Sequence, residues 1–124
     1  NLILSGHSHC LEHIRTLKTG HADSHLDWIV CGGSGASLRR QRRAGAQIIE
    51  MMGQEGVQHI QAVAQSQEYV GRQRQGGKER NLHTFLRIDV QEGSPLCLVV
   101  RPFVVEQRQQ WTSYPLSAIA LPSV

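Results

Sequence analysis

The N-terminal segment constrains the fold most, because an apolar run ends in a glycine and two histidines. Leu2-Ile3-Leu4 is typical of a short buried strand, and Gly6-His7-Ser8-His9 follows it as a turn. Side chains of an extended segment alternate with period two, so His7 and His9 are expected to point the same way. Gly6 lets the backbone turn sharply and approach a ligand closely. We therefore expect His7 and His9 to bind two metal ions lying side by side, one histidine to each.

The same residues allow other interpretations. His7 and His9 fit an ordinary pair of surface or core histidines with hydrogen bonds. His9, Cys10 and His13 also fit a local zinc site, but no second Cys/His pair follows at finger-like distance, which argues against it. We expect His13 either to lie beside the site, behind a ligand or facing substrate, or to be exposed, and we favour exposure.

Two further segments precede the middle of the chain. Residues 10–19 fit a short helix or an alternating strand. Asp27 to Cys31 is a compact apolar run that predicts a strand, and Gly32-Gly33-Ser34-Gly35 ends it. Such a glycine turn serves either tight packing or phosphate binding. It lacks the Gly-Lys-Ser/Thr ending of a P-loop, so we favour packing.

The rest of the chain divides into a basic segment and a β segment. Apolar spacing predicts a helix over 36–52 and a second one over 57–70, the latter alternatively a helix followed by a strand. Residues 71–81 are rich in glycine and charge and predict a mobile loop. Strands over 84–90 and 96–105, joined at 92–95, predict a hairpin, followed by a tail. The expected parts of one domain, residues 1–124, are therefore 1–38, 39–82 and 83–124.

Composition narrows the class of protein and its compartment. Three cysteines, an odd number widely spaced, argue against a disulfide framework and favour a reducing, cytoplasmic location. No apolar run approaches the roughly 20 residues that a membrane span needs, so no membrane partner is expected. The sequence predicts a globular chain with a modest, mostly aliphatic core.

Positive charge is concentrated in two places. The formal net charge is +3, and arginines and lysine gather at Arg39, Arg40, Arg42, Arg43, Arg72, Arg74, Lys78 and Arg80. Such clusters attract phosphate-bearing ligands or nucleic acid, although a solvated surface is the more ordinary interpretation and the one we favour. Interleaved aromatic residues are missing, so we do not expect nucleic acid to be a partner.

The segment Leu2–Leu11, LILSGHSHCL, resembles the final metal-binding motif of the calcineurin-like metallophosphoesterases. HSHCLEHI followed by DWIVCGGSG resembles their purple-acid-phosphatase-like branch, and the resemblance covers residues 1–38. It implies an α/β (α+β) fold, the C-terminal portion of an αββα sandwich with mixed strands and a C-terminal hairpin. It also implies hydrolysis of phosphate mono- or diesters with two divalent ions, Mn, Fe or Zn. His7 and His9 would be metal ligands, with Gly6, His13 and Gly33 behind them or facing the phosphoester substrate.

The sequence departs from the family pattern in one large respect. The family places Asp-x-His, Gly-Asp-x-x-Asp, Gly-Asn-His-Asp/Glu and another histidine before this motif, and none is present here. We therefore expect the 124-residue chain to be inactive alone and to need the missing N-terminal half of the domain. The alternatives are a basic, non-enzymatic binding module and a half-domain that forms a homodimer through exposed strand edges.

Overall fold

The computed structural model describes residues 2–35, 37–42, 45–52 and 59–122, and among these residues every regular element is a strand. In chain order the strands are β1 Leu2–Ser5, β2 Leu11–Thr16, β3 Asp27–Cys31, β4 Gln47–Met52, β5 His59–Val70, β6 Arg72–Gln75, β7 Lys78–Asn81, β8 His83–Gln91, β9 Cys97–Gln107, β10 Trp111–Pro115 and β11 Ile119–Leu121.

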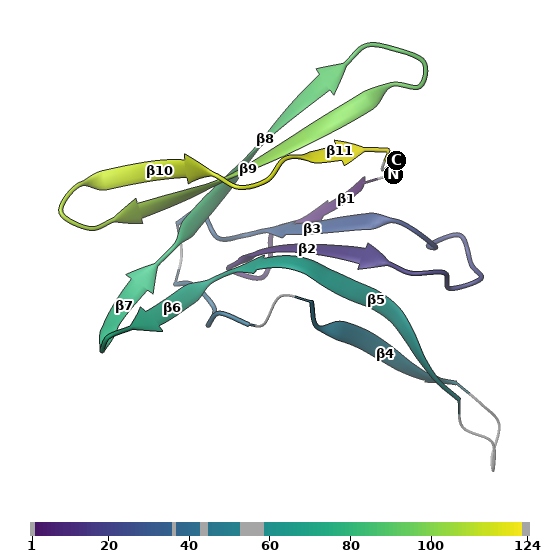
Figure 1. Ribbon diagram of the computed structural model, residues 1–124, viewed down its shortest axis with the longest axis horizontal. Coiled ribbons are helices and arrows are strands. Elements are labelled where there is room, and N and C mark those ends of the chain that lie inside the picture. The colour runs from purple at the N-terminus through teal and green to yellow at the C-terminus, as the bar shows by residue number, and fades with distance from the viewer. Residues whose placement is uncertain (1, 36, 43–44, 53–58, 123–124) are drawn as a thin grey trace.

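The first half of the chain forms a mixed five-stranded sheet with the order β1-β3-β2-β5-β4 (Figure 1). β1 is parallel to β3, and the other neighbours are antiparallel. β1 and β4 are the edge strands, so β1 has one hydrogen-bonding edge without a partner strand in the described part of the chain. The turn that carries the histidines therefore leaves the sheet from an edge.

The second half forms a four-stranded antiparallel sheet around β9. β8 pairs with β9 along its length, while β10 and β11 share the opposite edge of β9. Pro102 lies where β10 gives way to β11, and its carbonyl accepts the Leu116 amide at 2.9 Å. Proline has no N–H to donate, so the break in pairing falls where β9 has no donor.

A buried cluster joins the two sheets, which lie one above the other in Figure 1. The five-stranded sheet contributes Leu11, Ile29 and Val70, and the second half of the chain contributes Leu82, Val100, Val104 and Leu121. Each of these aliphatic side chains, when fully buried, stabilises the fold by about 1.5–3 kcal/mol. The core is mostly aliphatic, as expected from the composition.

The predicted α/β fold and αββα sandwich are wrong, because the described residues contain strands and no helix. The expected helix over 36–52 is a loop followed by β4, with residues 36 and 43–44 outside the described residues. The expected helix over 57–70 is β5, with 57–58 also outside them. The segment 10–19, left open between helix and strand, contains β2.

Irregular pairing along β5 explains the misleading helical spacing. In the pairing of β5 with β4, Val63 has no partner residue. In the pairing of β5 with β2, Gln67 has no partner residue. An extra residue in a strand shifts the following side chains to the opposite face, which disrupts the period-two pattern expected of a strand. The apolar residues of β5 therefore lose their alternation and mimic helical spacing.

The predicted mobile loop over 71–81 is also wrong, because this segment forms the β6–β7 hairpin. Its turn residues Gly76 and Gly77 have φ of 58° and 76°. A two-residue hairpin turn of this kind requires positive φ at both positions, which glycine adopts without strain. The strand over 27–31 and the hairpin over 84–105 are confirmed, whereas the predicted tail contains two more strands, β10 and β11.

Candidate functional site

The histidine turn, residues Gly6–His9, follows directly on the end of β1 at Ser5. The chain bends here instead of continuing as a strand, so the period-two argument for the direction of the two imidazoles does not apply. His7 and His9 are nevertheless both exposed, while Ser8 between them is half-buried. The structure thus presents two imidazoles to solvent at the edge of the five-stranded sheet.

The imidazole of His9 is anchored by a hydrogen bond. Its Nδ1 lies 3.0 Å from the carbonyl oxygen of Ser37. A carbonyl can only accept, so Nδ1 carries the proton, and in the neutral ring Nε2 keeps its lone pair. The backbone of His9 is held as well, because its carbonyl accepts the Arg39 amide at 2.9 Å. This arrangement orients a ring whose second nitrogen is available to a ligand.

In the turn after β3, Gly32 packs against the histidine turn, and Gly33 packs against Cys10 and Thr84. A Cβ on Gly32 would collide with the carbonyl oxygens of Gly6 and Ser8, and a Cβ on Gly33 would lie 2.7 Å from Thr84 Oγ1. The Gly32 amide is already used, since it donates to the Cys10 carbonyl at 3.1 Å. These contacts confirm tight packing as the role of Gly32 and Gly33.

Gly6 itself meets no such constraint. A Cβ there would find no atom within 4 Å, and its φ lies outside the left-handed range. The sharp turn expected from Gly6 therefore does not depend on glycine at this position, and the close approach in this region occurs at Gly32.

His13 lies apart from the histidine turn, on β2 opposite Ile29 of β3. It is buried, and its Nε2 lies 2.6 Å from Asp27 Oδ1. The favoured expectation that His13 is exposed is wrong. Arg15 contacts the same carboxylate oxygen, its Nη2 at 3.0 Å, so Asp27 joins two partners across β2 and β3. Sequence reasoning missed this cluster because Asp27 opens an apolar strand and carries no motif.

The donors around the histidine turn are incomplete for a metal centre. No group of three or more His, Cys, Asp and Glu side chains that could hold a metal ion occurs in the described residues. The alternative zinc site fails in particular, because His13 is bound to Asp27 and Cys10 is buried. Burial also raises the pKa of the Cys10 thiol, which disfavours the thiolate that a metal binds.

Sequence reasoning treated the two basic segments as separate, but the structure brings them together beside this turn. Arg40, from the loop after β3, forms an isolated backbone bridge with Arg72 at the start of β6. The glycines of 71–81 could have indicated the β6–β7 hairpin, because paired glycines in a short polar segment are also typical of a hairpin turn.

Cys10, Cys31 and Cys97 are all free thiols. The described part of the chain has no helix of the length and apolarity that a bilayer crossing requires.

No protein-family model matches the chain, and neither a curated protein nor a solved structure matches it.

Proposed function

We propose that the histidine turn supplies two ligands, His7 and His9, to a two-metal phosphoesterase site. One observation carries this proposal: the exposed His9 side chain is held by a hydrogen bond from Nδ1 to the Ser37 carbonyl. Histidines that bind metals nearly always donate their other ring nitrogen to a carboxylate, a backbone carbonyl or water, which fixes tautomer and orientation. His7, exposed two residues away, would bind the second ion.

The chemistry of the donors sets what the remaining ligands must be. Neutral imidazole suits Mn, Fe or Zn, and a pair of such ions activates water and neutralises charge on a phosphoryl group during in-line displacement. Two imidazoles bring no negative charge to offset two divalent cations. The carboxylate ligands must therefore come from another part of the polypeptide or from a second chain.

The residues of this chain would hold and orient the metal-binding imidazoles. They would not by themselves transfer protons. Ser37 fixes the His9 ring, and Gly32 leaves space for the carbonyls of Gly6 and Ser8 to approach. Alone, the 124 residues should bind divalent ions weakly and hydrolyse phosphoesters little. The substrate of the complete protein would be a phosphate mono- or diester, in a cytoplasmic setting.

The test is His9→Asn in the full polypeptide that the gene encodes. The Asn amide can replace Nδ1 as donor to Ser37 but offers no counterpart of Nε2. We expect retained folding, loss of bound metal and at least about a 100-fold loss of phosphoester hydrolysis, which is the upper end for a mere supporting residue. His21→Ala, at an exposed histidine of another loop, is the control and should change neither the bound metal nor the rate of hydrolysis.

Metal content and hydrolysis are measured together, with p-nitrophenyl phosphate and bis(p-nitrophenyl) phosphate as probes of monoester and diester activity. If His9→Asn keeps both metal and activity, His9 is not a ligand and the proposal fails.

A further inference from the structure

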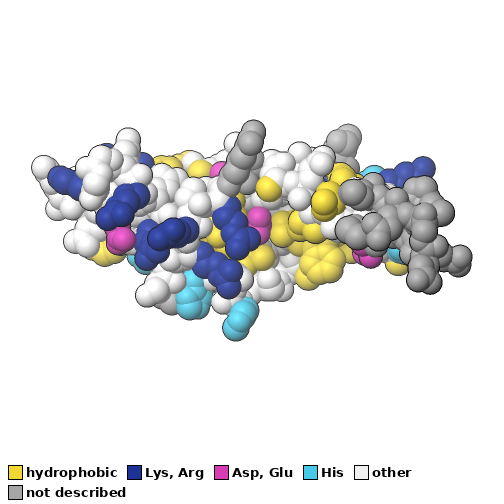
Figure 2. Space-filling view, turned by 90° about the horizontal axis from the view of Figure 1, so that it is seen from below, with side chains coloured by type: hydrophobic (Ala, Val, Ile, Leu, Met, Phe, Trp, Pro, Cys, Tyr) yellow, Lys and Arg dark blue, Asp and Glu magenta, His cyan; other side chains and the backbone are white. Residues whose placement is uncertain are grey.

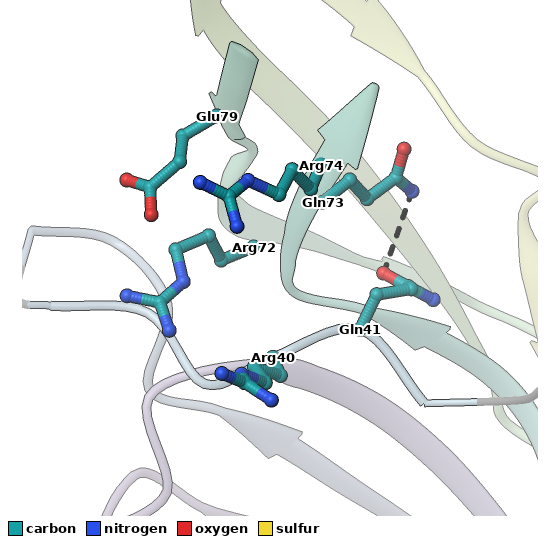
Figure 3. Close-up of a pocket in the computed structure, with 6 residues that line it drawn as sticks. All are labelled: Arg40, Gln41, Arg72, Gln73, Arg74 and Glu79. Atoms are coloured by element: carbon teal, nitrogen blue, oxygen red, sulfur yellow. Dashed lines mark hydrogen bonds between the residues drawn. The ribbon is translucent and has the colours of Figure 1, made fainter. Parts of the chain in front are cut away.

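Two arginine-bearing segments that are far apart in the sequence, around Arg40 and around Arg72, form one pocket. The Arg72 amide donates to the Arg39 carbonyl at 2.7 Å, and the Gln41 amide donates to the Arg72 carbonyl at 2.8 Å. The loop after β3 is thus attached to β6 like an additional short strand. The same pocket is therefore lined by Arg40 from the loop and by Arg72 and Arg74 from β6 (Figure 3).

The floor of this arginine pocket is fixed by a second set of contacts. The Gln41 side chain accepts the Gly71 amide at 2.8 Å and donates to the Tyr69 carbonyl at 2.5 Å. A Cβ on Gly71 would lie 2.5 Å from the Arg39 carbonyl oxygen, so only glycine fits there without a shift. The backbone that carries the three arginines is therefore set before any ligand arrives.

The pocket has a volume of about 530 Å³ and an excess of positive charge. Its lining residues are Arg40, Gln41, Arg72, Gln73, Arg74 and Glu79. In the described part of the chain none of its three arginines forms an ion pair, even though Arg74 lies opposite Glu79 in the β6–β7 register. Three guanidinium groups thus converge with one carboxylate among them.

Four arginines of the second sheet and of the hairpin beside it are paired with carboxylates. Arg80 and Arg108 both contact Glu106, and Arg87 and Arg101 both contact Asp89. Three positive charges held close together with one carboxylate among them still repel one another, and an anion between them would relieve that repulsion. Among the described residues, Arg40, Arg72 and Arg74 lack such carboxylate partners, as do the exposed Arg39 and Arg42 of the same loop, so this region differs from the paired arginines at Glu106 and Asp89.

We propose that the arginine pocket binds a small anion that carries two or more linked phosphate groups. Each guanidinium presents a planar fork that matches phosphate oxygens, and three forks exceed what one phosphate needs. The lining contains no aromatic side chain on which a base could stack, which disfavours single-stranded nucleic acid. The ligand is either an inorganic phosphate chain or the phosphate chain of a nucleotide.

The pocket and the histidine turn are joined by a connecting segment. Figure 2 shows Lys and Arg side chains gathered on the face seen from below, with histidine side chains projecting beside them. The segment 37–41 connects the two, because Ser37 accepts from His9 and the Arg39 amide donates to the His9 carbonyl. The proposed anion site goes beyond the proposed function, because it requires no metal.

The test is calorimetric titration of the encoded polypeptide in EDTA, at low and at high salt, with tripolyphosphate, ATP and a single-stranded oligonucleotide. Arg40→Gln and Arg74→Gln should each weaken tripolyphosphate binding by about tenfold, the loss expected for one charge-assisted contact. Arg87→Gln removes the same charge outside the pocket and should change the affinity by less than about twofold. Circular dichroism establishes that each variant remains folded.

The ligands separate the outcomes. Tighter binding of tripolyphosphate identifies an inorganic chain, and tighter binding of ATP identifies a nucleotide; either supports the proposal. Equal losses in all three variants, no binding of either phosphate chain, or preferential binding of the oligonucleotide with a steep salt dependence would overturn it. His9→Asn should leave binding in EDTA unchanged, so the anion site and the metal site can fail independently.

Discussion

At the scale of single residues, one buried carboxylate organises the contact between β2 and β3. Asp27 is 3% exposed and contacts both His13 and Arg15. A buried charge is tolerated when charged or hydrogen-bonded partners surround it, and loss of one member leaves the others without compensation. Asp27 is therefore a structural residue of the sheet from which the histidine turn departs.

Replacing Asp27 tests this role. Asp27→Ala removes the carboxylate that buried His13 and half-buried Arg15 both contact, and we expect the free energy of unfolding to fall by about 3 kcal/mol. Urea denaturation followed by circular dichroism measures the change. Glu92→Gln, in the exposed β8–β9 turn, is the control and should have little effect. A loss no larger than that of the control would show that the cluster contributes no net stability.

A second carboxylate predicts a pH dependence of stability. Hydrogen bonds from the Arg80 guanidinium lower the pKa of buried Glu106 from 4.5 to about 2. Because the folded-state pKa lies below the unfolded one, this contribution is fully present above pH 4.5 and is lost as the pH falls toward 2. It amounts to about 3 kcal/mol at neutral pH.

Unfolding measured between pH 2 and pH 7 checks the Glu106 prediction. The native chain should lose stability steeply between pH 4.5 and 2, and Glu106→Gln should be less stable at neutral pH with a flatter profile in that window. Parallel profiles for the two proteins would assign the acid sensitivity to other groups.

The exposed donors could be found from the sequence, whereas their partners could not. His7 and His9 follow an apolar run and a glycine, and that pattern alone indicates a turn at the end of a strand. Ser37, Asp27 and the unpaired state of Arg40, Arg72 and Arg74 depend on which distant segments meet. No local sequence pattern specifies these contacts between distant segments.

At the scale of elements, the turn after β3 packs closely against the histidine turn because Gly32 has no side chain. Gly32→Ala would drive a methyl group into the carbonyls of Gly6 and Ser8, which are backbone atoms and cannot rotate away. We expect a loss of about 1–3 kcal/mol in stability, as for overpacking, and reduced metal binding in the full polypeptide. Thermal unfolding and metal analysis measure the two effects.

Gly35→Ala is the matched control, because a Cβ there meets nothing within 4 Å and its φ is unstrained. It should leave stability and metal content near those of the native chain. Similar losses for both variants would mean that the glycine run acts through backbone freedom and not through packing.

Elements with uninterrupted patterns were predictable, and those with irregular pairing were not. The β3 strand is a compact apolar run, and the β8–β9 hairpin alternates up to a turn with glycine and proline. In β5 the skipped residues Val63 and Gln67 disrupt the alternation, and its buried face includes Ser66, whose hydroxyl donates to Glu12. A polar residue on the inner face of an irregular strand gives no strand signal.

At the scale of the whole molecule, the two sheets share a core but leave sheet edges open. On edge strand β1, Ile3 and Leu4 are 37% and 47% exposed. An exposed apolar edge strand is a template for pairing with another chain. We expect the 124-residue chain, expressed alone, to self-associate through β1, in the absence of any other segment that covers it.

Leu4→Lys should shift the isolated chain toward monomer, because a charged side chain on an edge opposes strand pairing. Sedimentation velocity at several concentrations measures the shift. Leu96→Lys is the control, since Leu96 is similarly exposed at 57% but lies in a turn outside the strands. Association that persists equally in both variants would exclude the β1 edge as the interface.

The break at Pro102 has a consequence for how the molecule opens. β10 is exposed along its whole length, whereas β11 buries Leu121 in the core. Because Pro102 separates their pairing with β9, β10 can detach without disturbing β11. In deuterated solvent the amide protons that join β10 to β9 should exchange through this local release, while those between β11 and β9 should persist until the two sheets separate.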